Sequence, residues 1–127
     1  MDITPQVPEG RQLIQGYGGG GFRIAGQRHR GSVLVRRERT EAWAVADAAA
    51  VTLESLAGLV RTVSDETPEI LLVGCGAKAM VPPVVLRREL RSMGVSLEWM
   101  DTGAACRTFN VLIAEERRVA AALIAVD

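Results

Sequence analysis

The chain has 127 residues, of which 48% are hydrophobic and 24% are charged, a composition that is typical of one globular domain and excludes wholesale disorder. Its 15 basic and 15 acidic residues cancel, so the net charge gives no reason to expect nucleic acid or an anionic membrane as a partner. No stretch approaches the roughly 20 apolar residues of a membrane span, so stable membrane insertion is not expected.

The first residues of the chain predict no regular element. Residues 1–11 contain Pro5, Pro8 and Gly10 and little hydrophobic periodicity, so we expect a mobile or extended lead-in to a single α/β domain at 12–127. The start also lacks the charged and apolar regions of a signal peptide. The two cysteines, Cys75 and Cys106, are too few for a disulfide framework, and we expect a cytoplasmic protein.

The first half of the chain has the pattern of antiparallel strands. Five glycines fall within residues 16–21. A phosphate-binding loop would need a helix after them, but an alternating strand pattern follows, so a structural turn is favoured over an anion-binding nest. Apolar residues then alternate from Phe22 to Val45, which predicts an antiparallel meander. Thr52 can cap a helix that ends near Ser64.

The second half of the chain alternates strands and helices. The continuous apolar run at 70–73 predicts a strand that is covered on both faces. A helix begins at 82–83 and ends at Gly94. The apolar residues Val84, Leu86, Leu90 and Met93 have helical spacing. A strand at 95–100, a helix from 101–102 and a final strand at 119–126 complete a β-α-β-α-β order, which implies parallel strands and right-handed crossovers.

Two loops, at residues 74–78 and 101–107, each follow a predicted buried strand and lead into a predicted helix. Because the carboxyl ends of parallel strands meet at one edge of a sheet, both loops would lie there, with the free N–H groups of helix N-termini nearby. This arrangement predicts a pocket for an anionic small ligand. The candidate pocket residues are Gly74, Cys75, Gly76, Lys78, Asp101, Thr102, Gly103, Cys106 and Arg107. The structural alternative is that the glycines permit a sharp turn and that Asp101 and Thr102 cap a helix.

The thiol of Cys106 allows two interpretations. Its place near a helix N-terminus and Arg107 would lower the thiol pKa and favour redox or nucleophilic chemistry. Cysteine is also among the residues most often buried, which favours simple packing. His29 is the only histidine, and the sequence contains no cluster of Cys and His ligands. We therefore expect no catalytic triad, no metal site and no cofactor.

Arginines concentrate between residues 23 and 39, where only Glu38 opposes them. The candidate partner face consists of Arg28, Arg30, Arg36, Arg37 and Arg39. These residues could dock an acidic partner, or they could form the solvated face of strands and turns. No aromatic residues are interleaved with them for base stacking, so nucleic acid is not expected.

Three segments of the chain resemble a widespread family of small domains of unknown function. They are Gly16–Phe22, Leu71–Gly76 and, above all, Met100–Leu112 with its Asp-Thr-Gly-Ala-Ala-Cys-Arg-Thr sequence. The family includes a mitochondrial respiratory complex I assembly factor and an adipogenesis-associated protein, and the resemblance runs from about Leu13 to Val126. Family members more often have another small residue, typically threonine, where Cys75 stands, which weakens the case for redox chemistry that pairs Cys75 with Cys106.

The resemblance implies a compact three-layer α/β domain. A mixed central sheet would have a smaller β layer beside it and helices opposite, in agreement with the meander and the β-α-β-α-β half. It carries over no catalytic set, and it implies a non-enzymatic protein-interaction or assembly factor, for a respiratory or other membrane complex. The alternative is a small-molecule-binding protein or enzyme that holds an anion at the two loops. A homodimer through an exposed strand edge is a further possibility.

Overall fold

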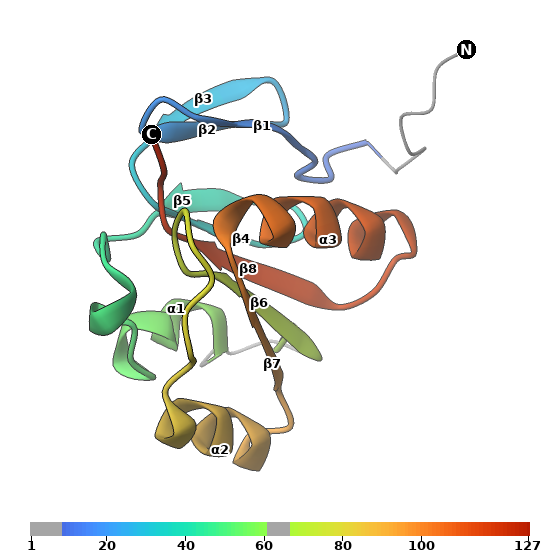
Figure 1. Cartoon of the computed structure of the whole chain (residues 1–127). Helices are drawn as coiled ribbons and strands as arrows, with labels where there is room; N and C mark the ends of the chain where they lie inside the picture. The colour runs from blue at the N-terminus through green and yellow to red at the C-terminus, as the bar shows by residue number, and fades with distance from the viewer. Residues whose placement is uncertain (1–8, 61–66) are drawn as a thin grey trace.

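The structure, a computed structural model, describes residues 9–60 and 67–127 and contains two β-sheets. The strands are β1 (Ile14–Gly18), β2 (Gly21–Ile24), β3 (Gln27–Arg30), β4 (Val33–Val35), β5 (Thr40–Ala42), β6 (Ile70–Gly74), β7 (Ser96–Met100) and β8 (Val119–Leu123). The helices are η1 (Ala48–Ala50), η2 (Glu54–Leu56), α1 (Ala57–Val60), α2 (Val84–Ser92) and α3 (Thr102–Ala114). The smaller sheet has the order β1-β2-β3 and the larger one β5-β4-β8-β6-β7 (Figure 1).

The predicted meander is antiparallel, but it divides between the two sheets. β1, β2 and β3 pair in sequence, whereas β4 leaves them and pairs antiparallel with β8 in the larger sheet. The reason lies in Val33–Val35, three consecutive apolar residues that are all buried, as expected for a strand covered on both faces. Trp43 and Val45, which continue the alternating pattern, follow the end of β5 and pack in the core.

The glycine run forms the turn between β1 and β2, as predicted. Gly18, Gly19 and Gly20 have φ values of 123°, 60° and 81°, a region that residues with a Cβ rarely adopt. Gly18 pairs with Gly21 across this hairpin, and a strand follows directly. The run therefore lacks the helix that a phosphate-binding loop requires.

The second half has the predicted parallel topology. β6 pairs in parallel with β7 on one side and with β8 on the other. α2 connects β6 to the adjacent β7, and α3 carries the chain from β7 past β6 to β8. β8 ends at Leu123, earlier than the predicted Val126.

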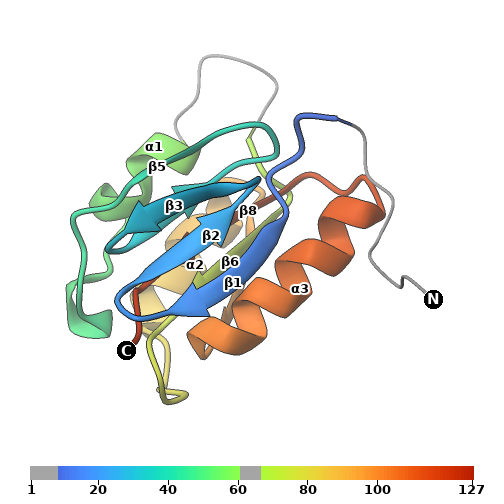
Figure 2. The same cartoon turned by 90° about the horizontal axis from the view of Figure 1, so that it is seen from above.

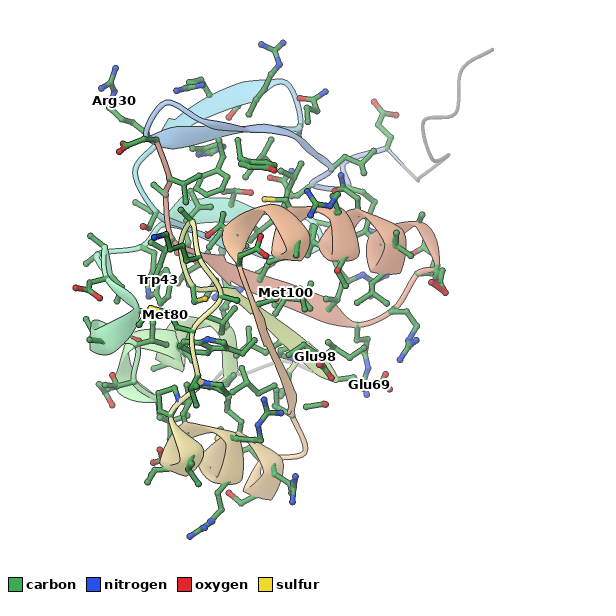
Figure 3. The ribbon with its side chains drawn as sticks, viewed as in Figure 1. Arg30, Trp43, Glu69, Met80, Glu98 and Met100 are labelled. Carbon is green, nitrogen blue, oxygen red and sulfur yellow. The ribbon has the colours of Figure 1, made fainter. Side chains whose placement is uncertain are left out.

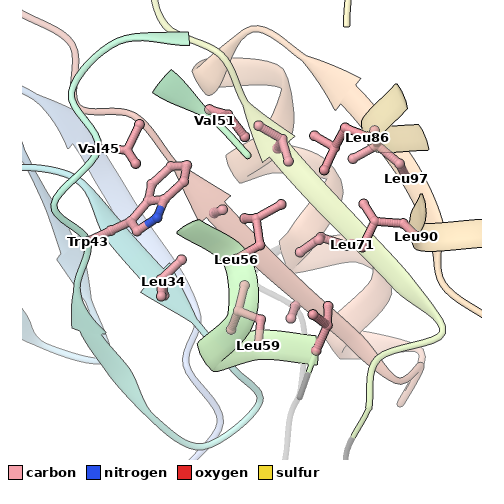
Figure 4. Close-up of a cluster of buried hydrophobic side chains, with 14 of the residues drawn as sticks. Leu34, Trp43, Val45, Val51, Leu56, Leu59, Leu71, Leu86, Leu90 and Leu97 are labelled. Carbon is pink, nitrogen blue, oxygen red and sulfur yellow. The ribbon is translucent and has the colours of Figure 1, made fainter. Parts of the chain in front are cut away.

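The larger sheet lies between two apolar clusters and forms the middle layer. On one face α3 and the smaller sheet pack side by side (Figure 2). Phe22, Phe109 and Leu123 are buried between these elements and the larger sheet. On the other face α1 and α2 bury Leu56, Leu71 and their neighbours together with Trp43 (Figure 4). Two of the three α-helices thus lie opposite the smaller sheet, as the resemblance implies, while α3 lies on the same side as that sheet.

The helix expected after Thr52 begins as the short η2 and continues as α1. The Thr52 hydroxyl accepts a hydrogen bond from the Ser55 N–H at 3.1 Å, and the Ser55 hydroxyl accepts one from the Thr52 N–H at 2.9 Å. This reciprocal capping satisfies N–H groups that have no partner in the first turn. The predicted end near Ser64 lies outside the described residues.

Candidate functional site

The two loops of the candidate pocket lie together at one edge of the larger sheet, as predicted. The Cys75 N–H donates to the Met100 carbonyl at 2.8 Å, and the Thr102 N–H donates to the Gly76 carbonyl at 2.9 Å. The loop after β6 is therefore hydrogen-bonded directly to the start of α3. This contact follows from the parallel pairing of Gly74 with Met100.

Thr102 occupies the centre of this junction. Its side chain is fully buried, and its hydroxyl accepts from the Gly76 N–H at 3.0 Å and donates to the Ile124 carbonyl at 2.8 Å. A Cβ on Gly74 would lie 2.9 Å from the Thr102 Cα, so the two backbones touch because Gly74 has no side chain. Gly74 and Thr102 thus pack the junction closely.

Asp101 caps α3. Its Oδ1 accepts a hydrogen bond from the Ala104 N–H at 2.9 Å, and its carboxylate lies at the positive end of the helix. The structure confirms the capping interpretation for this residue. That bond also uses one of the N–H groups that an anionic ligand would need.

The two cations of the candidate pocket are both exposed. The Arg107 guanidinium donates to the Tyr17 hydroxyl at 3.4 Å, and Tyr17 reaches from β1 to lie over Gly103. Among residues 9–60 and 67–127, the Lys78 side chain has neither an ion pair nor a hydrogen bond, and its carbonyl accepts from the Cys75 thiol at 3.4 Å. The structure thus places Arg107 against the smaller sheet.

Both cysteines are buried and free. Burial raises the pKa of the Cys106 thiol to about 12, against a smaller opposite effect of the Arg107 charge, while Asp101 raises it further. The expected lowering of this pKa by the helix N-terminus and the arginine is therefore wrong. The reason is that Cys106 packs in the apolar cluster under α3, where the thiolate would lose its hydration.

The predicted arginine face separates into two groups at opposite ends of the smaller sheet. Arg28 and Arg30 lie on β3, where Arg30 pairs with Gly21 at the β1–β2 turn and projects away from the sheet (Figure 3). Arg28 donates to the Gly18 and Gly19 carbonyls at 3.4 Å. The other group lies at the β4–β5 turn, where the Arg37 carbonyl accepts from the Gln12 N–H just before β1.

The arginines of the β4–β5 turn are held by carboxylates. Arg36 pairs with Glu41 at 2.6 Å and also donates to the Gly58 carbonyl. Arg39 lies 3.7 Å from the same Glu41. The sequence pattern does not predict these ion pairs. They neutralise part of the positive charge of the arginine face within the protein.

Arg11, which no sequence motif marks, belongs to this group. Its guanidinium pairs with Glu38 at 2.6 Å and with Glu116 at 3.0 Å, and its side chain is only 13% exposed. The hydrogen bond to Glu116 is the main cause that raises the Arg11 pKa. Glu116 also pairs with Arg37 at 3.2 Å. No local pattern signals these contacts, because residues 11, 38 and 116 are far apart in the chain.

A cleft of about 420 Å³ opens beside this turn. Its lining residues are Arg36, Arg37, Glu38, Arg39, Leu59, Pro68, Arg118, Val119 and Ala120. Val119 begins β8 and pairs with Ile70, whereas the two predicted loops lie at the Gly74–Leu123 end of the same strands. The cleft therefore lies at the opposite edge of the sheet from the candidate pocket.

The second surface feature is apolar, and we call it the Met80–Val85 ridge. Met80, Val81, Val84 and Val85 have exposed fractions of 55%, 87%, 69% and 65%. Of the four apolar residues with helical spacing, Leu86 and Leu90 are the buried residues of α2, whereas Val84 is exposed. Figure 3 shows Met80 on the segment that leads to α2.

Within the described residues, no helix combines the length and apolar character needed to cross a membrane. The same residues also contain no group of three or more His, Cys, Asp or Glu side chains that could hold a metal ion. These two findings concern only residues 9–60 and 67–127.

Comparison with known proteins places the chain among relatives of similar size and fold. An uncharacterized protein of Rhodobacter capsulatus is 44% identical over 124 residues, which are 96% of this chain and 93% of that protein. The crystal structure of an outer membrane protein from Bartonella henselae matches with a TM-score of 0.83 and 41% identity, and covers 93% of this chain and 98% of that one.

A third relative is longer than this chain. NADH dehydrogenase (ubiquinone) 1 alpha subcomplex assembly factor 3 of Xenopus tropicalis is 38% identical over 113 residues, which are 88% of this chain and 60% of that protein. This chain therefore spans less than two thirds of that factor. The family described as protein of unknown function (DUF498/DUF598) matches residues 14–124. Because that match covers nearly the whole fold, this chain belongs to the DUF498/DUF598 family.

Proposed function

We propose that this chain is a protein-interaction factor that assists the assembly of a larger complex. Its likeness to a relative named as an assembly factor of NADH dehydrogenase supports this function. The observation that carries the proposal is the Met80–Val85 ridge, because it gives the molecule a surface suited to docking another protein.

The ridge concentrates exposed apolar side chains. It contains four of the six large exposed hydrophobic residues described, and the other two, Tyr17 and Val111, lie on β1 and α3. Exposed apolar side chains that gather on one surface often mark a site of protein interaction. Lys78 precedes the ridge in the chain, Arg88 follows it, and both side chains are exposed. The partner therefore presents an apolar surface that is bordered by carboxylates.

Affinity capture with paired variants tests this function. The tagged protein at native expression level is compared with a Val81→Asp/Val84→Asp variant, and captured proteins are quantified by mass spectrometry. Val111→Asp is the matched control, because Val111 is 56% exposed on another helix. We expect subunits of a membrane complex to be enriched, to be lost from the ridge variant and to be retained by the control. Equal capture by all three proteins would remove the ridge as the docking surface.

The arginine face remains a second candidate for docking an acidic partner. Charge reversal of Arg36 and Arg37 would also break their pairs with Glu41 and Glu116, so these variants would test the fold as well as the surface. Arg28→Glu/Arg30→Glu gives a cleaner experiment, since neither guanidinium has a carboxylate partner in the part of the chain that the structure describes. Unchanged capture by this variant would remove the β3 part of the face from the docking surface.

A further inference from the structure

We propose that the cleft beside the β4–β5 turn binds a small organic polyanion, whose carboxylate or phosphate oxygens contact its arginines. This function is independent of the docking role of the ridge, which follows β6 at the other edge of the sheet. Three observations support the proposal. They are the excess of positive charge, the shortage of hydrogen-bond acceptors for the arginine N–H groups, and the size and apolar lining of the cleft.

Among residues 9–60 and 67–127, positive charge exceeds negative charge in and around the cleft. Its network contains five arginines and three carboxylates: Arg11, Arg36, Arg37, Arg39 and Arg118, with Glu38, Glu41 and Glu116. Glu41 is shared between Arg36 and Arg39, and Arg118 has no carboxylate partner among the described residues. The Arg39 side chain is 67% exposed. Arg39 and Arg118 can therefore turn to an incoming anion without breaking a short internal pair.

Hydrogen-bond donors also exceed acceptors in this network. A guanidinium carries five N–H groups and no acceptor. The Nε atoms of Arg11, Arg36 and Arg37 are buried and have no hydrogen-bond partner in the structure. Buried polar groups are normally paired, because an unpaired one loses its hydration without compensation. An anion with several oxygens would accept hydrogen bonds from the exposed N–H groups of Arg39 and Arg118, which have no short carboxylate partner among the described residues.

The rest of the cleft suits an organic body. Leu59, Pro68, Val119 and Ala120 supply apolar surface next to the arginines. The volume of about 420 Å³ falls within the range of small-molecule sites, which is roughly 300–1,000 Å³. A bare inorganic ion would fill little of this space. The geometry thus favours a metabolite-sized molecule with two or more anionic groups.

Isothermal titration at constant ionic strength tests the proposal with two probes, citrate for carboxylates and tripolyphosphate for phosphates. The variant Arg39→Ala/Arg118→Ala removes the two most exposed arginines of the cleft. Arg88→Ala/Arg91→Ala is the matched control, since both residues are exposed on α2 and away from the cleft. Circular dichroism confirms that each variant is folded.

We expect saturable binding of one molecule of at least one probe per chain, weakened tenfold or more in the cleft variant and unchanged in the control. The probe that binds more tightly identifies the anionic group. Absence of saturable binding by both probes, or equal weakening in the two variants, would overturn the proposal. Anion binding by the Val81→Asp/Val84→Asp variant should be unaffected, which separates this result from the test of the ridge.

Discussion

The Thr102 hydroxyl accepts a hydrogen bond from the Gly76 N–H at 3.0 Å, and this bond ties the start of α3 to the loop after β6. The same hydroxyl donates to the Ile124 carbonyl just beyond β8. One buried side chain therefore links three segments at the carboxyl edge of the sheet. The backbone bond from the Thr102 N–H to the Gly76 carbonyl reinforces this link.

Replacement of Thr102 by valine should destabilise the protein by about 1–3 kcal/mol, because it leaves a half-buried N–H and a buried carbonyl without their side-chain partner. Valine has nearly the same shape, so the loss would come from hydrogen bonding and not from a cavity. Chemical denaturation measures the free energy of unfolding. Thr102→Ser, which keeps the hydroxyl, is the control and should cost less. A valine variant as stable as the wild type would contradict the linking role of this hydroxyl.

Two glycines near this junction should respond differently to alanine. A Cβ on Gly74 would lie 2.9 Å from the Thr102 Cα, which is backbone and cannot move without shifting α3. A Cβ on Gly103 would meet the Tyr17 hydroxyl, the far end of an exposed side chain that can rotate away. We expect Gly74→Ala to lower the thermal midpoint well below that of Gly103→Ala. Similar midpoints would show that the sheet edge yields more easily than its packing indicates.

Asp101 should stabilise α3 through its capping bond to the Ala104 N–H. Asp101→Ala is expected to cost about 0.5–2 kcal/mol in unfolding free energy, a typical range for the loss of an N-cap side chain. Asp101→Asn keeps an acceptor oxygen and should retain most of that stability, while losing the favourable charge at the helix N-terminus. Equal loss in both variants would indicate that the charge, and not the hydrogen bond, is what matters.

The position of the two loops could be predicted because it depends on local pattern. The apolar run at Ile70–Val73 and the capping residue Asp101 mark a strand end and a helix start, and parallel pairing then brings the loops together. The burial of Thr102 could not be predicted in this way. A threonine at a helix start is usually a solvated cap, and the two hydrogen-bond partners of Thr102 come from the segments that follow β6 and β8.

Other features depended on contacts that the sequence pattern does not contain. The cleft combines residues 36–39, 59, 68 and 118–120, which only the tertiary fold brings together. The exposure of Val84 arises because a period of 3.6 residues does not fix which apolar positions of a short helix meet the sheet. Val33–Val35, in contrast, carried a usable signal. Three consecutive apolar residues predict a strand covered on both faces, and hence the split of the meander.

The buried thiol of Cys106 predicts both slow alkylation and a particular pH dependence of stability. Because burial raises its pKa from 9.0 to about 12, the folded state keeps a proton that the unfolded state releases above pH 9. This contribution to stability is complete below pH 9 and is lost as the pH rises towards 12. In the Cys75→Ala background, we expect iodoacetamide at pH 7 to modify Cys106 far more slowly than a free cysteine. The additional variant Cys106→Ala should lose less unfolding free energy between pH 9 and 11. Rapid labelling of the folded protein, or identical pH profiles, would contradict the burial of this thiol.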